Sequence, residues 1–379
     1  MNIELTDKND TLRLSGCATN KHFIGPKHVT IELNNTCNLT CKYCCAWQML
    51  NKTTRPNIQL KIAQFKKLIS DFKALHVHRV KLSAAGETLM NPFALPMIEF
   101  THQNGMEVEL NTNAILLNKK TIPHLSRVET ININLSSTSE KEFRSFQGAP
   151  PFAFKKVLDN IVSLGKLREQ SKTFKPRINL FFILTKDNYT RIIPMLKLAE
   201  KLPINSITFK MAILSRSQIN LAIDFKHRSQ LIQIIKTCLQ KKLYRCTETN
   251  LKELATTLLS ATFNKGYSTC APADIRHNRS IYFERKFRKN FRCYIGWFSS
   301  FIDFLGNVYF CCHQKTSNIG NINTNSFYKI LNSAKAQQER LRLKENFDFR
   351  CEEWKICNDC SEIKLNSYVT SILYENNRY

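Results

Sequence analysis

Three closely spaced cysteines follow a short apolar segment near the start of the chain. Cys37, Cys41 and Cys44 have the spacing Cys-x3-Cys-x2-Cys, and Tyr43 precedes the third cysteine. Three thiolates on one loop can bind three irons of a cubane iron–sulfur cluster and leave the fourth iron open to another molecule. The alternative is a structural zinc site with Cys45 as the fourth ligand. Because adjacent cysteines chelate one tetrahedral ion poorly, we favour the cluster.

The segments that must position this loop alternate between strand-like and helix-length stretches. The strand-like stretches cover residues 29–33, 79–83, 107–111, 130–135, 177–184 and 206–210. The helix-length stretches cover residues 58–75, 96–103, 119–125, 152–167 and 189–202. Six such units predict a partial parallel barrel, in which functional residues gather at the carboxyl ends of the strands.

The cysteine loop and its position after the first strand resemble those of the radical S-adenosylmethionine (SAM) superfamily. In that superfamily the open iron binds SAM, and reductive cleavage of SAM yields a 5′-deoxyadenosyl radical that abstracts a substrate hydrogen. The resemblance implies an α/β fold built on a partial (β/α)6 radical SAM barrel. It implies a SAM-binding 4Fe-4S cluster and SAM as cofactors, and an electron donor such as flavodoxin or ferredoxin as a partner.

Glycine and polar residues after strands two to four resemble the superfamily's SAM-binding segments. Gly86 and Glu87 end a Gly-Gly-Glu-like segment with alanine as its first residue, and relatives hold the SAM amino group there. Asn134 and Ser136 share one face of the fourth strand and are candidates for contacts to the SAM ribose. Arg144 would approach the SAM carboxylate, with a solvent-facing arginine as the alternative. The SAM-binding residues that the resemblance implies are Tyr43, Gly86, Glu87, Asn113, Asn134, Ser136 and Arg144.

The cysteines in the last quarter of the chain resemble those of the SPASM and twitch extensions of radical SAM enzymes. Cys293 precedes a hairpin-like segment in which Gly306 marks the turn and Cys311 follows, and Cys357 and Cys360 lie near the end. The resemblance implies an α+β twitch/SPASM-like domain with one auxiliary 4Fe-4S cluster bound by these four cysteines. Two spare cysteines could replace one of them: Cys312 and Cys351. A zinc ribbon is the alternative.

The chain has 379 residues, a formal net charge of +26 and 43% hydrophobic residues, enough to build a substantial core. It shows no membrane-spanning run and no signal-peptide pattern, so we expect a cytoplasmic protein. Fourteen cysteines in such a chain favour metal binding over disulfides. Basic and aromatic residues alternate at residues 285–292, where we favour a solvated surface over a nucleic-acid site.

We expect four regions: an N-terminal extension (1–28), the radical SAM barrel (29–212), a helical and basic linker or lid (213–290) and the auxiliary-cluster domain (291–379). By analogy with relatives, the protein would be an oxidoreductase or maturase that oxidises or modifies a peptide, a protein or a small molecule. The alternatives are radical SAM modification of RNA or another anionic substrate, and a zinc-stabilised nucleic-acid-binding module without catalysis. The sequence identifies no catalytic acid or base.

Overall fold

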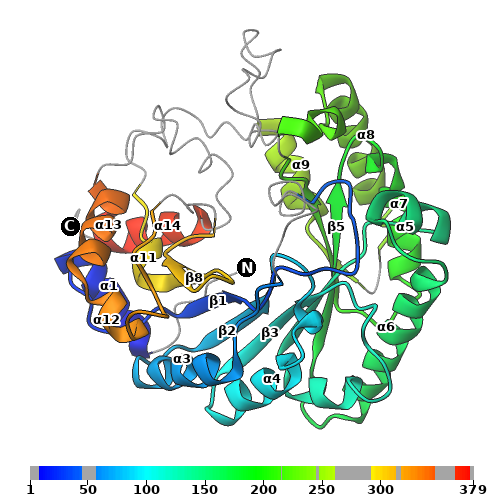
Figure 1. The fold of residues 1–379 in the computed structure, drawn as a ribbon. Coiled ribbons are helices and arrows are strands. Elements are labelled where there is room, and N and C mark those ends of the chain that lie inside the picture. Colours follow the sequence, from blue (N-terminus) through cyan, green and yellow to red (C-terminus); the bar gives the residue numbers. More distant parts are fainter. Residues whose placement is uncertain are drawn as a thin grey trace.

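One mixed sheet organises the protein (Figure 1). The computed structural model describes residues 8–44, 57–214, 216–244, 247–260, 292–312, 317–345 and 363–375. Within these ranges the sheet has ten strands in the order β10-β9-β8-β1-β2-β3-β4-β5-β6-β7. They are β1 His28–Glu32, β2 Arg79–Ser83, β3 Glu107–Thr112, β4 Thr130–Asn134, β5 Arg177–Leu184, β6 Ser206–Met211, β7 Glu248–Thr249, β8 Ser299–Ile302, β9 Asn307–Tyr309 and β10 Gly320–Asn321.

The strands β1 to β6 run parallel in sequence order, as expected for a partial barrel. Among the described residues, β10 and β7 form the two ends of the sheet and do not pair with each other, so the sheet is not closed. All six predicted strands are confirmed to within one or two residues at each end. These strands could be predicted from the sequence because a strand that buries only its outer face alternates apolar and polar residues.

Helices cover the outer face of the curved sheet (Figure 1). The α-helices are α1 Lys8–Thr19, α3 Ile62–Ala74, α4 Ala94–Gln103, α5 Glu140–Gln147, α6 Ala153–Gln170, α7 Ile192–Ala199, α8 Phe225–Gln240, α9 Leu251–Ser260, α11 Ile295–Phe298, α12 Phe327–Leu331, α13 Ala334–Glu345 and α14 Ile363–Thr370. Shorter turns are η1 Thr88–Met90, η2 Ile122–Arg127, η3 Tyr189–Arg191, η4 Arg216–Leu221 and the π-helical η7 Ser371–Glu375.

Three predicted helices differ from the observed ones. The helix expected at residues 189–202 begins as the turn η3 and is α-helical only over Ile192–Ala199. The helix expected at residues 58–75 begins only at Ile62, because Ile58 and Leu60 bond to the backbone that leads into the cysteine loop. The helix expected at residues 119–125 is the 3-10 turn η2, with a proline in its first turn. Proline lacks the N–H that a longer α-helix would need at interior positions.

The alternation along the strands separates an apolar outer layer from a polar inner face. Val80 and Leu82 of β2 are fully buried, on the side that the helices cover. Lys81, between them, pairs with Glu109 of β3 at 2.6 Å, and Asn132 of β4 donates to the same carboxylate at 2.6 Å. Because these charges and amides satisfy one another, this part of the barrel's inner face is polar but its charges are paired.

The C-terminal region joins the barrel through its sheet. Strand β8 runs parallel to β1, with Ile302 beside Ile31, and β9 returns antiparallel to β8. Gly306 lies in the turn with φ of +84°, which confirms the predicted hairpin, since glycine adopts this conformation without strain. The four region boundaries expected from the sequence stay predictions.

The N-terminal helix α1 packs on α11 of the C-terminal region (Figure 1). Asp10 of α1 is buried and pairs with Arg13 at 2.8 Å and with Lys27 at 2.6 Å. Trp297 of α11 donates from its indole to the carbonyl of Lys21 at 2.8 Å. These contacts fix α1 and α11 beside the start of β1.

Candidate functional site

The cysteine loop lies at the carboxyl end of β1, and its two halves are held by different elements. We call residues 34–38 the front half and residues 40–44 the rear half. The front half bonds to the segment after β2: Ala85 N–H donates to the Asn34 carbonyl at 3.0 Å, and Glu87 N–H donates to the Thr36 carbonyl at 2.7 Å. These backbone bonds place the loop at the functional end of the barrel.

Gly86 is required by the approach of the front half. A Cβ at Gly86 would lie 1.8 Å from the carbonyl oxygen of Thr36 and 2.2 Å from its carbonyl carbon. No side chain fits against backbone atoms at these distances. The glycine therefore serves the packing of the cysteine loop, and its predicted contact with SAM stays a prediction.

Glu87 links the ends of β2 and β3. Its buried carboxylate accepts hydrogen bonds from Thr112 Oγ1 at 2.6 Å, from the backbone N–H of Asn113 at 2.7 Å and from the backbone N–H of Leu89 at 3.2 Å. Burial raises the pKa of Glu87, and the three hydrogen bonds oppose that rise. Both oxygens of the carboxylate thus accept hydrogen bonds from the protein, and the predicted contact of Glu87 with SAM stays a prediction.

Asn113 ties the end of β3 to the cysteine loop. Its amide nitrogen donates to Asn38 Oδ1 at 2.7 Å, while its own Oδ1 accepts from the backbone N–H of Ile115 at 3.1 Å. Only 5% of Asn113 is exposed. The residue predicted to bind SAM therefore also anchors the front half.

The rear half rests on the carboxyl end of α5. The carbonyl of Gln147 accepts from Thr40 N–H at 3.1 Å, and the carbonyl of Phe146 accepts from Lys42 N–H at 2.9 Å. The last carbonyls of a helix have no partner within it, so the cysteine loop supplies partners that α5 lacks. Gly148 ends the helix with φ of +61°, and a Cβ there would lie 1.9 Å from Thr40 Oγ1.

Tyr43 and Ser136, both predicted SAM contacts, bond to each other. The Tyr43 hydroxyl donates to Ser136 Oγ at 3.0 Å, and the same oxygen accepts from Ile183 N–H at 2.9 Å. Burial raises the pKa of Tyr43 well above its usual value, so the hydroxyl stays protonated and remains a donor. Their direct contact to SAM stays a prediction.

The two remaining predicted SAM contacts are less constrained. Asn134 ends β4 and is half-buried, and its side chain has no hydrogen-bond partner among the described residues. Arg144 lies on α5 with its side chain exposed. Both keep their polar groups available, which their predicted roles require.

Sequence reasoning missed Gln147, the residue that joins α5 to the loop. Its side chain is 1% exposed, and its Oε1 accepts from Ser136 N–H at 2.7 Å and from Ser137 Oγ at 3.3 Å. A signal for α5 was present: Ser139 caps the helix by accepting from Glu142 N–H at 3.3 Å, the Ser-x-x-Glu pattern of a helix start. Nothing in the sequence indicated that the helix end would meet the cysteines.

The three cysteine side chains of the loop are partly buried neighbours. Burial raises the pKa of Cys37 to about 11 and that of Cys41 further, and charge on the neighbouring thiolates raises both. The described residues contain no group of three His, Cys, Asp or Glu side chains drawn around a single metal ion. A cubane presents a separate iron to each thiolate, and the three cysteines of the loop can supply three such ligands.

The predicted auxiliary ligands are only partly described. Cys293 is buried before α11, where its N–H donates to the Leu343 carbonyl at 3.2 Å. Cys311 follows β9 and is partly buried, and its neighbour Cys312 is exposed. The other cysteines considered as metal ligands lie outside the described residues: Cys45, Cys351, Cys357 and Cys360.

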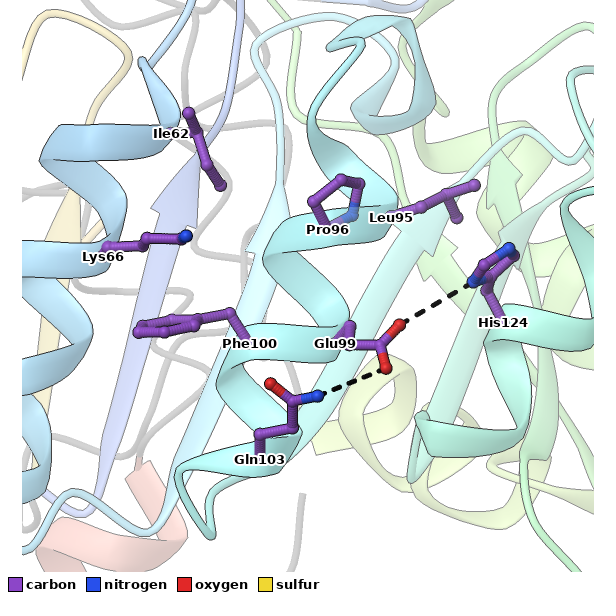
Figure 2. Close-up of a pocket in the computed structure, with 8 residues that line it drawn as sticks. All are labelled: Ile62, Lys66, Leu95, Pro96, Glu99, Phe100, Gln103 and His124. Carbon is purple, nitrogen blue, oxygen red and sulfur yellow. Dashed lines mark hydrogen bonds and ion pairs between the residues drawn. The ribbon is translucent and has the colours of Figure 1, made fainter.

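A surface pocket of about 300 Å³ lies on the outer side of the barrel, between α3, α4 and η2 (Figure 2). Phe100 forms part of its wall, and Glu99 interacts with His124 at 3.9 Å and Gln103 at 3.3 Å. No predicted site residue lines it, so we assign it no role. None of the helices in the described ranges has the length and apolar character needed to cross a bilayer.

Comparisons with known proteins match both cysteine regions. Residues 31–199 match the family model of the radical SAM superfamily, and residues 293–361 match the SPASM iron–sulfur cluster-binding domain. The chain is 32% identical over 137 residues to the uncharacterized protein MJ0804 of Methanocaldococcus jannaschii, covering 35% of this chain and 42% of the relative. It is 28% identical over 147 residues to a probable GTP 3′,8-cyclase of Methanosarcina mazei, covering 35% and 40%. The chain thus matches less than half the length of each relative.

The fold is similar to that of a solved SAM-bound protein. Streptococcus suis SuiB bound to S-adenosylmethionine superposes with a TM-score of 0.62 at 14% identity, covering 94% of this chain and 78% of SuiB. The thiolate loop, its position after β1 and its bracing by the neighbouring strand ends fit a SAM-binding 4Fe-4S cluster, and the SPASM match implies an auxiliary iron–sulfur cluster. These matches identify a radical SAM domain at residues 31–199 and a C-terminal SPASM domain at residues 293–361.

Proposed function

We propose that this radical SAM enzyme oxidises or modifies a peptide or protein substrate, with Cys37, Cys41 and Cys44 as ligands of the SAM-binding cluster. When bound, that cluster and SAM supply a 5′-deoxyadenosyl radical that removes a substrate hydrogen. One observation carries the proposal: the cysteine loop lies at the carboxyl end of β1, fixed between the ends of β2 and β3 and the end of α5. Functional residues of parallel barrels lie at this end.

The chain's own residues would orient the cofactor and substrate. Gly86, Glu87 and Asn113 hold the front half, and Tyr43 and Ser136 hold the rear half against β4 and β5. We propose that Asn134 and Arg144, whose polar groups remain available, bind the SAM ribose and carboxylate. Holding these groups in fixed positions reduces the rearrangement needed during reaction.

We propose one auxiliary 4Fe-4S cluster bound by Cys293, Cys311, Cys357 and Cys360. Cys311 follows directly on the hairpin that extends the barrel sheet beyond β1. This shared sheet connects the two cysteine regions through adjacent strands. Such a cluster would accept an electron from the substrate radical, and an electron donor such as flavodoxin or ferredoxin would reduce the first cluster.

The peptide class is supported by the barrel's inner face. Lys81 is paired with Glu109 at 2.6 Å, and Asn132 connects Glu109 to Asn179 through its amide at 2.6 and 3.3 Å. Paired charges and amides suit a neutral hydrogen-bonding substrate better than a phosphate. SuiB, which shares the fold at 16% identity and a TM-score of 0.59, has been solved with its precursor peptide SuiA.

The first test is anaerobic reconstitution with iron quantified and 5′-deoxyadenosine measured after dithionite reduction. Wild type should bind about eight irons per chain and cleave SAM. Cys41→Ala should lose about four irons and SAM cleavage. Cys311→Ala should also lose about four irons but retain SAM cleavage, because the first cluster is separate.

The adjacent cysteine provides the matched control. Cys312→Ala should keep about eight irons and full SAM cleavage, since Cys312 is exposed and is not an assigned ligand. Loss of iron in Cys312→Ala but not in Cys311→Ala would show that Cys312, and not Cys311, is the ligand of the auxiliary cluster. If the wild type bound zinc without iron and did not cleave SAM, the proposed radical SAM activity would be refuted.

A second candidate is an anionic substrate such as RNA or a nucleotide. The net charge of +26 and the match to a probable GTP 3′,8-cyclase favour it. Binding through phosphates weakens steeply as salt increases. Binding of a labelled RNA that is unchanged between 50 and 200 mM salt, on the order of the range over which phosphate contacts respond, would exclude an electrostatic RNA site.

A further inference from the structure

We propose that Gln147 is a positioning residue that fixes the cysteine loop relative to the end of β4. This inference rests on the proposed role of the loop in holding the SAM-binding cluster. Gln147 is the last residue of α5 and is almost completely buried. It is the one residue of α5 that contacts both the loop and β4 through bonds described above.

The side chain of Gln147 holds the exit of β4. Its Oε1 accepts from Ser136 N–H at 2.7 Å and from Ser137 Oγ at 3.3 Å, and its Nε2 donates to the Asn134 carbonyl at 3.4 Å. One amide thus satisfies three polar groups over four consecutive residues. These residues include both predicted ribose contacts, so the amide sets where that face of the site lies.

The main chain of Gln147 holds the rear half of the cysteine loop. Its carbonyl accepts from Thr40 N–H at 3.1 Å and from Cys41 Sγ at 3.7 Å. The bond from Thr40 does not depend on the protonation of Cys41, so it persists when that thiol gives up its proton to bind iron. Gly148 permits this approach, because any Cβ there would collide with Thr40.

The two sets of contacts act through a single residue. If the amide of Gln147 is lost, the exit of β4 can shift while the carbonyl contacts to the loop remain. The expected consequence is a change in the position of SAM relative to the cluster, with the three cysteines still in place. A residue that only stabilised the fold would lower stability without this effect.

Gln147→Leu tests the proposal. The control is a matched amide, Asn205, at the amino ends of the strands, opposite the cysteine loop. Asn205 precedes β6, and its Oδ1 accepts from Ile178 N–H at 2.9 Å and from Arg168 Nη1 at 2.7 Å. Asn205→Leu therefore removes a similar set of hydrogen bonds far along the strands from the cysteine loop. Both variants are purified anaerobically as the full reconstituted chain.

The readouts are melting temperature, iron content, the KM for SAM, and the electron paramagnetic resonance spectrum of the reduced cluster with and without SAM. Both variants should lower the melting temperature and retain iron. Only Gln147→Leu should raise the KM for SAM, by about tenfold, the factor that corresponds to about 1.4 kcal/mol. It should also change the spectral shift that SAM produces.

Equal KM values and equal SAM-induced spectra for Gln147→Leu and wild type would overturn the proposal. If Gln147→Leu fails to fold, Gln147→Glu replaces it, because glutamate keeps an acceptor for Ser136 N–H but loses the donor to the Asn134 carbonyl. Gln147→Glu should then raise the KM for SAM and change the SAM-induced spectrum, and wild-type values of both would overturn the proposal. Failure of the proposed function is distinct, because the wild type itself would then show no SAM-dependent spectrum.

Discussion

The front and rear halves of the cysteine loop are held in different ways. The front half is held by the backbone N–H groups of Ala85 and Glu87, and by packing against Gly86 that leaves no space for a side chain. The rear half is held by the end of α5 and by hydroxyl and amide groups around Ser136. The front half therefore has almost no tolerance for displacement, whereas the rear half meets side chains that can rotate.

Gly86→Ala should have the largest effect, because the new methyl group meets backbone. Its Cβ would lie 1.8 Å from the Thr36 carbonyl oxygen, so the loop itself must move. Overpacking of this kind costs about 3 kcal/mol, the upper part of the usual range. We expect loss of the first cluster, measured as about four irons fewer per chain, and loss of SAM cleavage.

Gly105→Ala serves as the control for a general glycine effect. Gly105 has φ of +81° and open space around its Cα. Alanine there costs about 1–2 kcal/mol of backbone strain but meets no neighbour, so iron content should be unchanged. Normal iron loading in Gly86→Ala would contradict the close packing of the front half.

Gly148→Ala tests the rear half and should have a smaller effect. Its Cβ would lie 1.9 Å from Thr40 Oγ1, a side-chain atom, and alanine would also occupy φ of +61°. We expect a loss of about 1–2 kcal/mol, with the cluster retained and SAM cleavage reduced. Melting temperature and 5′-deoxyadenosine yield measure the two effects.

Removing the clashing hydroxyl separates strain from collision. In the double variant Gly148→Ala with Thr40→Ala, the 1.9 Å collision with Oγ1 disappears, and the backbone strain remains with a tight 3.0 Å approach to the Cβ of residue 40. SAM cleavage should therefore recover while the melting temperature stays low. An equal or greater loss of cluster in Gly148→Ala than in Gly86→Ala would reverse the proposed difference between the halves.

The difference between the front and rear halves also explains which contacts of the cysteine loop could be predicted from the sequence. Gly86 and Glu87 follow directly on a strand with clear alternation, so their place at the barrel's functional end could be predicted from the chain order. Gln147 acts through its helix-terminal carbonyl and through an amide that reaches the backbone of β4. Such contacts depend on where one helix ends in space, and they leave no periodic pattern in the sequence.

Long-range strand pairing was unpredictable for a related reason. The hairpin around Gly306 was predicted correctly, because a turn glycine is a local signal. Its parallel pairing with β1, more than 260 residues earlier, brings Ile302 beside Ile31. Either edge of a partial barrel can accept a further strand, so local propensity does not determine which edge the hairpin joins.

An ion pair away from the loop gives the smallest expected effect and a reference for both halves. Glu107 lies at the start of β3 and pairs with Arg79 Nε at 2.8 Å and with His78 at 3.4 Å. The hydrogen bond from His78, together with the guanidinium of Arg79, lowers the pKa of Glu107 from 4.5 to about 2. Iron content and SAM cleavage should be unchanged in Glu107→Gln, since the residue lies at the amino end of the strand.

The pH dependence of this variant follows from the direction of the shift. Because the folded-state pKa is the lower one, the ion pair stabilises the protein fully above about pH 4.5 and progressively less as pH falls towards 2. Glu107→Gln should therefore be less stable than wild type at pH 7, by about 1 kcal/mol for this partly exposed pair, and the difference should shrink on acidification. Comparing the two proteins at each pH cancels the acid sensitivity that their clusters share. A stability difference between the two proteins that stays constant with pH would show that Glu107 acts through packing. Loss of iron in Glu107→Gln would show that a change at the amino end of the strands disturbs the cysteine loop.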